Sequence, residues 1–229
     1  MASRKKMTVF LDLDESIISA QEYETINPSN PKVKKFKYSV MDQDFYVFER
    51  PNLQPFLDFC FKNFNVSVWT AASRSYMTFI VKNIIQRKRR KIEYALFSDH
   101  CDLSDRKYRC MKSLKMLWHR YGLDQFDSSN TVIIDDNADL KKYQSAQTIV
   151  IKPFKFNQAG SEKDDVLMGH VKPLLEKFLR AGRVRSPPSR VPVGSPTRKP
   201  KPKKAETKKP VVKKPEVKPK IKKKSPTKK

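Results

Sequence analysis

The sequence has few cysteines and no long apolar run. Its 229 residues include three cysteines, Cys60, Cys101 and Cys110, and no C-x-x-C pair. An odd number without that spacing indicates a reduced, intracellular compartment. Cys101 and Cys110 with His100 and His119 do not have the spacing of an ordinary zinc site. No stretch approaches the ~20 apolar residues of a membrane helix, and the basic start is unlike a secretory leader, so no membrane association is expected.

Aromatic residues are absent from the end of the chain, and acidic ones are scarce there. Residues 183–229 hold 19 Lys and Arg against two acids, a net charge of +17, and ten of the 16 prolines. Such a segment cannot build a core and its charges repel, which predicts a disordered basic tail. All 14 Phe, 8 Tyr and 2 Trp lie in residues 1–182. That length suits one domain with its own core, which we expect to be monomeric.

Apolar runs alternate with amphipathic segments along residues 1–182. The apolar runs predict buried strands over 7–14, 65–70, 94–98, 131–137 and 148–154. Helices are predicted over 50–64, capped by Asn52, over 73–91, capped near Ser73, and over 109–122 and 163–182. Residues 35–50 predict a hairpin turning at 41–44. The alternation indicates a three-layer, Rossmann-like α/β fold with a mostly parallel sheet and a hairpin insertion after the first strand.

Polar side chains close three of these apolar strands. Asp12 and Asp14 end the first, Thr70 ends the second, and Asp135 and Asp136 end the fourth. Burying a carboxylate costs roughly several kcal/mol unless something compensates it. Ligands of such sheets bind outside the carboxyl ends of the strands. The sequence therefore predicts a functional site at this edge.

The pattern of acids favours magnesium. Asp12 and Asp14 are two residues apart, so they point to the same side if the strand geometry persists. They would then repel each other unless a cation lies between them or one takes a proton. Mg²⁺ prefers oxygen ligands of this type, and Asp135 with Asp136 would complete its site.

The same residues suit phosphoryl transfer. One carboxylate can attack phosphorus and the other can act as general acid and base. Thr70 offers a hydroxyl to a phosphoryl oxygen, and Lys112, within the helix expected over 109–122, can offset developing charge. Taken singly, Thr70 can be a strand residue, Lys112 a solvated charge and Asp135-Asp136 a turn.

Four short motifs carry a family resemblance. "DLDES", "VWTAAS", "MKSL" and "VIIDDN" resemble the four motifs of the haloacid-dehalogenase superfamily. Within it, the sequence is similar to the phosphatases of the RNA polymerase II carboxy-terminal domain, also called the NLI-interacting-factor-like group. "ERPNLQPFL" at 49–57 resembles that group's R-P segment. The resemblance covers roughly residues 7 to 180 and implies the fold, a Mg²⁺ cofactor and a phosphoprotein substrate.

The resemblance also implies a role for each motif residue. Asp12 matches the nucleophile, Asp14 the general acid and base, Thr70 the phosphate-binding threonine, Lys112 the charge-neutralising lysine, Asp136 the direct metal ligand, Asp135 its support, and Ser16 a usual threonine. In the family the ion is held by the nucleophile's carboxylate and the main-chain carbonyl of the second aspartate, here Asp14.

Two stretches depart from the family pattern. Ser98 stands where relatives have an arginine that reads phosphates of the substrate, and Arg106 or Arg109 are the candidates to replace it. Residues 19–36 are polar and lysine-bearing where relatives often supply an apolar pocket for proline. Both departures concern the substrate and leave the catalytic motifs intact.

The tail suggests a second function. "RSPPSR", "GSPTRK" and "KSPTKK" resemble the Ser-Pro-basic elements of linker-histone tails, which predicts electrostatic, sequence-tolerant contact with DNA or RNA. A nuclear-import signal is compatible with this, and a plain solubilising linker is the alternative. Phosphorylation at Ser186, Ser195 or Ser225 would reduce the charge and weaken either function.

The leading hypothesis is a Mg²⁺-dependent phosphoserine or phosphothreonine phosphatase of the nucleus that forms an aspartyl-phosphate. Its target would be the polymerase tail or another nuclear protein. One alternative is a polynucleotide phosphatase, because the chain is strongly basic. Another is a non-catalytic nucleic-acid-binding or scaffold protein on a phosphatase fold. The intact Asp12 and Asp14 oppose this last reading, and the serine at position 98 favours it.

Overall fold

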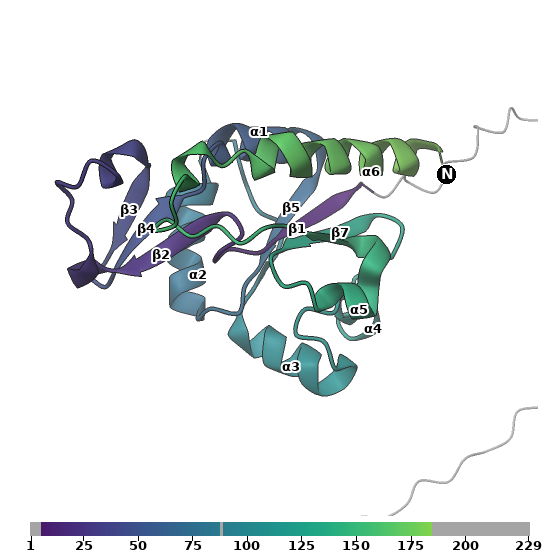
Figure 1. Cartoon of the computed structure of the whole chain (residues 1–229). Coiled ribbons are helices and arrows are strands. Elements are labelled where there is room, and N and C mark those ends of the chain that lie inside the picture. The colour runs from purple at the N-terminus through teal and green to yellow at the C-terminus, as the bar shows by residue number, and fades with distance from the viewer. Residues whose placement is uncertain (1–5, 88, 185–229) are drawn as a thin grey trace, which may run out of the picture. The chain divides into compact units, whose positions relative to one another are not determined.

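The larger of two sheets is parallel throughout and has the first strand at its centre (Figure 1). The computed structural model describes residues 6–87 and 89–184. The strand order is β6-β5-β1-β7-β8. These strands are β1 (Thr8–Leu11), β5 (Asn65–Trp69), β6 (Ala95–Leu96), β7 (Thr131–Asp135) and β8 (Thr148–Val150). Every neighbouring pair is parallel, which confirms the predicted α/β architecture.

The smaller sheet is the predicted insertion after the first strand. It has the order β2-β4-β3, with β2 (Ile18–Glu22), β3 (Tyr38–Met41) and β4 (Phe45–Glu49) all antiparallel. The hairpin predicted over 35–50 is β3-β4, and Asp42 and Gln43 turn it with positive φ angles. Strand β2 was not predicted. Only its first two residues are buried, so its sequence lacks the apolar run that indicated the other strands.

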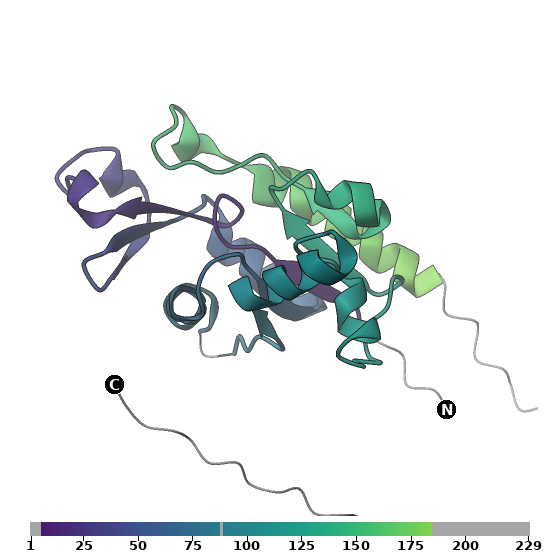
Figure 2. The ribbon, with the colours of Figure 1, turned by 90° about the horizontal axis from the view of Figure 1, so that it is seen from below.

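Helices cover both faces of the parallel sheet, so the fold has three layers (Figures 1 and 2). Helices α1 (Leu53–Asn63) and α6 (Lys172–Val184) lie along one face. Helices α3 (Ser98–Tyr108), α4 (Lys115–His119) and α5 (Leu140–Gln144) lie on the other. Strand β1 serves both cores: Val9 and Leu11 pack in the cluster with α1, and Phe10 packs with Trp69 in the opposite one. Helix α2 (Arg74–Ile80) begins at Ser73, whose hydroxyl accepts the N–H of Tyr76 as expected.

Short helical turns complete the described part of the chain. They are the 3-10 turns Tyr23–Thr25, Val33–Lys35, Ser145–Gln147 and Ser161–Lys163, and the π turns Val81–Ile85 and Val166–Val171. The helix expected over 163–182 starts later than predicted, because the π turn Val166–Val171 precedes α6, and α6 runs two residues beyond the predicted end.

Three other helix predictions need correction. The helix expected over 73–91 ends with the turn Val81–Ile85, because Gln86 is extended. The helix expected over 109–122 shrinks to α4, so Lys112 lies in the loop before it. Asn52 precedes α1 in a left-handed conformation and makes no side-chain cap; its amide donates to Asp165 instead.

The basic tail lies beyond the part of the chain that the structure describes. Residues 185–229, with Ser186, Ser195 and Ser225, are outside the described residues. The predicted boundary between a domain at 1–182 and a tail at 183–229 therefore stays a prediction. Within the described residues, no helix is both long and apolar enough to span a bilayer.

Candidate active site

The site is built on the turn that follows β1. The N–H of Asp12 donates to the carbonyl of Ile134 at 3.0 Å, which ties the end of β1 to β7. The chain then folds back, and the N–H of Ile17 donates to the carbonyl of Leu13 at 2.9 Å. Glu15 takes a left-handed conformation with φ of 54°. This tight turn holds the Asp12 side chain in place, with only 5% of the residue exposed.

A buried lysine bridges two of the acids. Lys112 Nζ lies 2.6 Å from Asp12 Oδ1 and 2.8 Å from Asp135 Oδ2. Burial alone would lower the pKa of Lys112, but the two carboxylates outweigh it and raise that pKa. Burial and the charge of Asp12 raise the pKa of Asp135 to about 6, and Lys112 limits that rise. Lys112 is therefore a fixed cation beside Asp12, and it reaches the site from a loop and not from the expected helix.

Ser16 joins the first and fourth motifs. Its hydroxyl donates to Asp12 Oδ2 at 3.0 Å and accepts the N–H of Asp136 at 3.1 Å. The N–H of Asn137 donates to Asp135 Oδ1 at 2.9 Å, so both carboxylate oxygens of Asp135 are engaged. Serine therefore supplies the hydroxyl that the resemblance assigned to a threonine.

Three carboxylates could hold a cation. Asp12, Asp135 and Asp136 each offer an oxygen within 4.8 Å of the others. Oxygen donors at this spacing suit Mg²⁺. Burial, followed by the charge of Asp12, raises the pKa of Asp136. Lys112 and Asn137 hold Asp135, and Lys112 and Ser16 hold Asp12, so Asp136 has the least engaged carboxylate of the three.

Asp14 has a different partner. Its carboxylate lies outside that cluster, and its Oδ1 accepts a hydrogen bond of 2.5 Å from the Tyr76 hydroxyl. Burial raises the pKa of Asp14, and the hydrogen bond from Tyr76 opposes the rise. Tyr76 was not among the predicted site residues, so sequence analysis missed this contact. Its position six residues after Thr70 was the available signal.

All four motifs meet at one cavity of about 350 Å³, which we call the catalytic cavity. Its lining is Asp12, Asp14, Glu15, Thr70, Ala71, Ala72, Met111, Lys112, Asp135, Asp136, Asn137 and Leu140. Thr70 is 1% exposed, and its Oγ1 accepts the N–H of Ala72 at 3.1 Å, which leaves its hydroxyl proton free to be donated. The structure thus brings every predicted site residue together, with Ser16 directly behind Asp12.

The structure shows where Ser98 and the candidate replacement Arg109 lie relative to the catalytic cavity. Ser98 is the first residue of α3 and its N–H donates to the carbonyl of Ala72, but Ser98 does not line the catalytic cavity. Arg109 lines a second cavity of about 220 Å³ that shares Met111, Asn137 and Leu140 with the first. Of the two replacements considered, Arg109 is therefore the nearer to the catalytic cavity.

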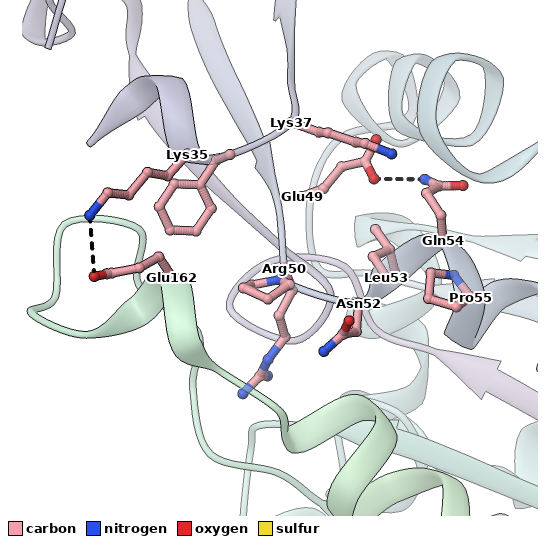
Figure 3. A pocket seen from close by; sticks show the side chains of 11 residues that line it. Lys35, Lys37, Glu49, Arg50, Asn52, Leu53, Gln54, Pro55 and Glu162 are labelled. Atoms are coloured by element: carbon pink, nitrogen blue, oxygen red, sulfur yellow. Dashed lines mark hydrogen bonds and ion pairs between the residues drawn. The ribbon is translucent and has the colours of Figure 1, made fainter. Parts of the chain in front are cut away.

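A buried arginine, Arg50, holds the turn that follows β1 in place. Arg50 is 1% exposed and donates to Asp164 through two hydrogen bonds of 2.8 and 2.9 Å. It also donates to the carbonyls of Ser16 and Lys152 at 2.9 and 3.0 Å. Figure 3 shows its side chain leaving the end of β4 toward the segment that carries Asp164. The R-P segment therefore fixes the catalytic turn, a role that the sequence did not reveal.

Comparison with known proteins agrees with the motifs. A model of the NLI interacting factor-like phosphatase family matches residues 7–185. The CTD phosphatase-like protein 355R of Invertebrate iridescent virus 6 is 41% identical over 179 residues, covering 75% of this chain and 98% of that protein. Its counterpart in Invertebrate iridescent virus 3 is 35% identical over 188 residues, covering 78% and 100%. The solved fission yeast RNA polymerase II CTD phosphatase Fcp1, bound to beryllium fluoride, aligns with a TM-score of 0.48 at 18% identity, over 79% of this chain and 52% of that one. The family match and the two viral relatives confirm the predicted resemblance: the chain belongs to the NLI interacting factor-like phosphatase family.

Proposed function

We propose that this chain is a Mg²⁺-dependent phosphoprotein phosphatase that hydrolyses phosphoserine or phosphothreonine through an aspartyl-phosphate on Asp12. One observation carries the proposal: the Asp12 carboxylate is held between Lys112 and Ser16 at the wall of a cavity that Asp14 also lines. A carboxylate held in this way is positioned to attack an electrophile in the cavity. Membership of a phosphatase family supports the same reading.

The two acids divide the chemistry. An Asp12 oxygen attacks phosphorus, and the bond from phosphorus to the substrate oxygen breaks as Asp14 gives that oxygen its proton. The raised pKa of Asp14 favours the protonated form that this step needs. Water then attacks phosphorus while Asp14 takes a proton from it. Inorganic phosphate leaves and Asp12 is restored.

Three further groups act on the phosphoryl oxygens. Lys112 places positive charge beside the oxygen that attacks, and the Thr70 hydroxyl donates to a phosphoryl oxygen. Asp12 and Asp136, with the main-chain carbonyl of Asp14, would hold Mg²⁺, which supplies positive charge against the transferring group. Asp135 holds Lys112 in position.

The substrate class follows from the family and the composition. We propose a polymerase tail or another nuclear phosphoprotein as the target, because the viral relatives are named for their likeness to carboxy-terminal-domain phosphatases. Residues 183–229 would contact DNA or RNA and hold the enzyme in the nucleus. The charge of +17 in that segment supports this part of the proposal.

The test is hydrolysis of a small aryl phosphate and of a phosphoserine peptide with Mg²⁺ or with a chelator. We expect turnover that the chelator abolishes and that Asp12→Asn removes, with Asp99→Asn, on the exposed surface of α3, as the matched control. The phosphorylated enzyme should release its phosphate on treatment with hydroxylamine, as acyl-phosphates do. Normal turnover by Asp12→Asn would exclude the proposed mechanism.

A further inference from the structure

We propose that a small pocket beside the catalytic cavity binds a second phosphate group of a multiply phosphorylated peptide substrate. This inference rests on the proposed function. The pocket, which we call the lysine pocket, has a volume of about 140 Å³. Residues 152–155, 158–161, 163 and 164 line it. It lies on the segment between β8 and α6.

The lysine pocket has an excess of positive charge. Lys152, Lys155 and Lys163 line it and are exposed, and Asp164 is the acid in its lining. Asp164 is already engaged by the Arg50 guanidinium through two hydrogen bonds, so it offsets little of the lysine charge. Lys32 reaches the same segment, since its Nζ donates to the Gln158 carbonyl at 2.8 Å. A phosphate monoester carries about −1.5 to −2 at neutral pH and is the small anion that such a pocket suits.

An ion pair links the linings of the lysine pocket and the catalytic cavity. Lys155 lines the former and Glu15 lines the latter, with Lys155 Nζ 3.4 Å from Glu15 Oε1. The main chains are also tied, because the N–H of Phe154 donates to the Glu15 carbonyl at 2.6 Å. An extended peptide rises ~3.3 Å per residue. A phosphoserine in the catalytic cavity can therefore carry a second phosphate, a few residues away, to the lysine pocket.

Two other cavities near the site have a smaller excess of positive charge in their linings or none. In the cavity of about 280 Å³ at the start of α1, Lys35 pairs with Glu162, and Glu49 accepts from Gln54 (Figure 3). In the cavity that Arg109 lines, two acids stand against two cations, and Lys142 pairs with Asp139 at 2.8 Å. Of these three cavities, the lysine pocket has the largest surplus of cations in its lining, three lysines against Asp164. Its small volume suits one phosphate group better than a groove that follows a nucleic-acid backbone.

The experiment compares peptides that carry one or two phosphoserines, with the second placed two to eight residues away on either side. The full-length protein is assayed with each peptide, with an aryl phosphate and with a DNA oligomer. The test variant is Lys152→Glu with Lys163→Glu, and the Gln pair serves if the Glu pair does not fold. The matched control is Lys62→Glu with Lys177→Glu, two exposed lysines on α1 and α6. The tail is present in every protein, so its own affinity for phosphate cancels.

We expect wild-type protein to have a KM about tenfold lower for the best doubly phosphorylated peptide than for the single one, since exposed charge contacts are individually weak. The test variant should bring the two KM values together without a change in kcat, and the control should keep them apart. Binding of the same peptides to the turnover-deficient Asp12→Asn protein should show the same pattern.

Three results would overturn the inference. In the first, the test variant keeps the wild-type preference for two phosphates. In the second, that preference is lost in Arg109→Ala instead, which places the second phosphate in the other cavity. In the third, the test variant loses affinity for the DNA oligomer alone, which assigns the pocket to nucleic acid. If the wild-type protein hydrolyses no phosphate ester at all, the proposed function fails first, so the two failures are distinguishable.

Discussion

Replacing Lys112 with methionine should harm both catalysis and folding, and the folding deficit should depend on pH. The side chains of Lys112, Asp12 and Asp135 are 7%, 7% and 1% exposed, so the lysine cation compensates two carboxylates that water scarcely reaches. Methionine keeps most of the volume and removes the charge. Two buried acids then remain without their partner. For catalysis, loss of a group that stabilises the transferring oxygens costs about 10²–10³ in kcat.

The magnitude of the folding deficit follows from burial. Removing one partner of a buried ion pair costs about 3–5 kcal/mol, because the remaining charge is uncompensated. For a domain of this size that lowers the melting temperature by about 10 °C. The deficit should be measured in EDTA, which keeps the acids free of metal.

The pH dependence has a definite sign. The pKa of Asp135 is raised in the fold to about 6, so this acid favours the folded state at low pH and disfavours it as pH rises through that value. Without Lys112 the pKa of Asp135 rises further, and the protonated Asp135 then needs no cation at pH 5. The raised pKa of Lys112 keeps it charged throughout this range. The deficit should therefore be small at pH 5 and complete at pH 8.

Urea unfolding at both pH values measures this directly. Lys115→Met is the control, since Lys115 is exposed on α4 three residues away. It should match the wild type in both turnover and stability. An equal deficit for Lys112→Met at pH 5 and pH 8, or none at either, would refute the assignment of Lys112 as the partner of the buried acids. Full turnover by Lys112→Met would refute its catalytic role.

Four further predictions concern other parts of the chain. Tyr76→Phe should lower kcat more for a phosphoserine peptide than for an aryl phosphate, because an aryl oxide leaves without a proton from Asp14; an equal loss for both would mean that Tyr76 does not position the acid. Arg50→Met should destabilise the fold by about 3 kcal/mol in urea unfolding, since the half-buried Asp164 loses its partner and the carbonyls of Ser16 and Lys152 lose a donor; unchanged stability would contradict the anchoring role. Ser98→Arg should lower the KM for polymerase-tail phosphopeptides and leave the aryl phosphate unaffected, and an equal response by both would mean that position 98 does not read the peptide. Removing residues 185–229 should abolish most salt-sensitive DNA binding and spare aryl-phosphate turnover; salt-insensitive DNA binding by the shortened protein would place that site on the folded domain.

The parallel sheet could be predicted because its strands have a strong local signal. Strand β7 is buried at every position, and β1 is too, so their apolar runs read as strands without any knowledge of their neighbours. Placing their carboxyl ends together then needs only the parallel topology. The pairing of Leu11 with Ile134 puts Asp12 beside Asp135 for this reason. The catalytic edge was thus accessible to sequence reasoning.

The segment around Lys112 could not be predicted in the same way. Its residues have helical period over 109–122, but Arg109 ends α3 in a left-handed conformation with φ of 55°. The chain then stays irregular, because Ser104 Oγ donates to the Cys110 carbonyl and accepts the N–H of Ser113. These contacts lie within a buried cluster that local propensity does not describe. The tertiary environment therefore overrides the helix and sets Lys112 on a loop.

The two acids of the first motif show why long-range partners decide function. The sequence places Asp12 and Asp14 on one side of a strand, on the condition that the strand continues, but β1 ends at Leu11. Beyond that point each carboxylate has its own hydrogen-bond partner. Lys112, a hundred residues away, donates to Asp12, and Tyr76, 62 residues away, donates to Asp14. A nearby cation stabilises a charged carboxylate, whereas burial raises the pKa of Asp14 and the Tyr76 hydroxyl opposes that rise. Two identical side chains two positions apart therefore lie in different electrostatic environments, which agrees with the different roles proposed for them.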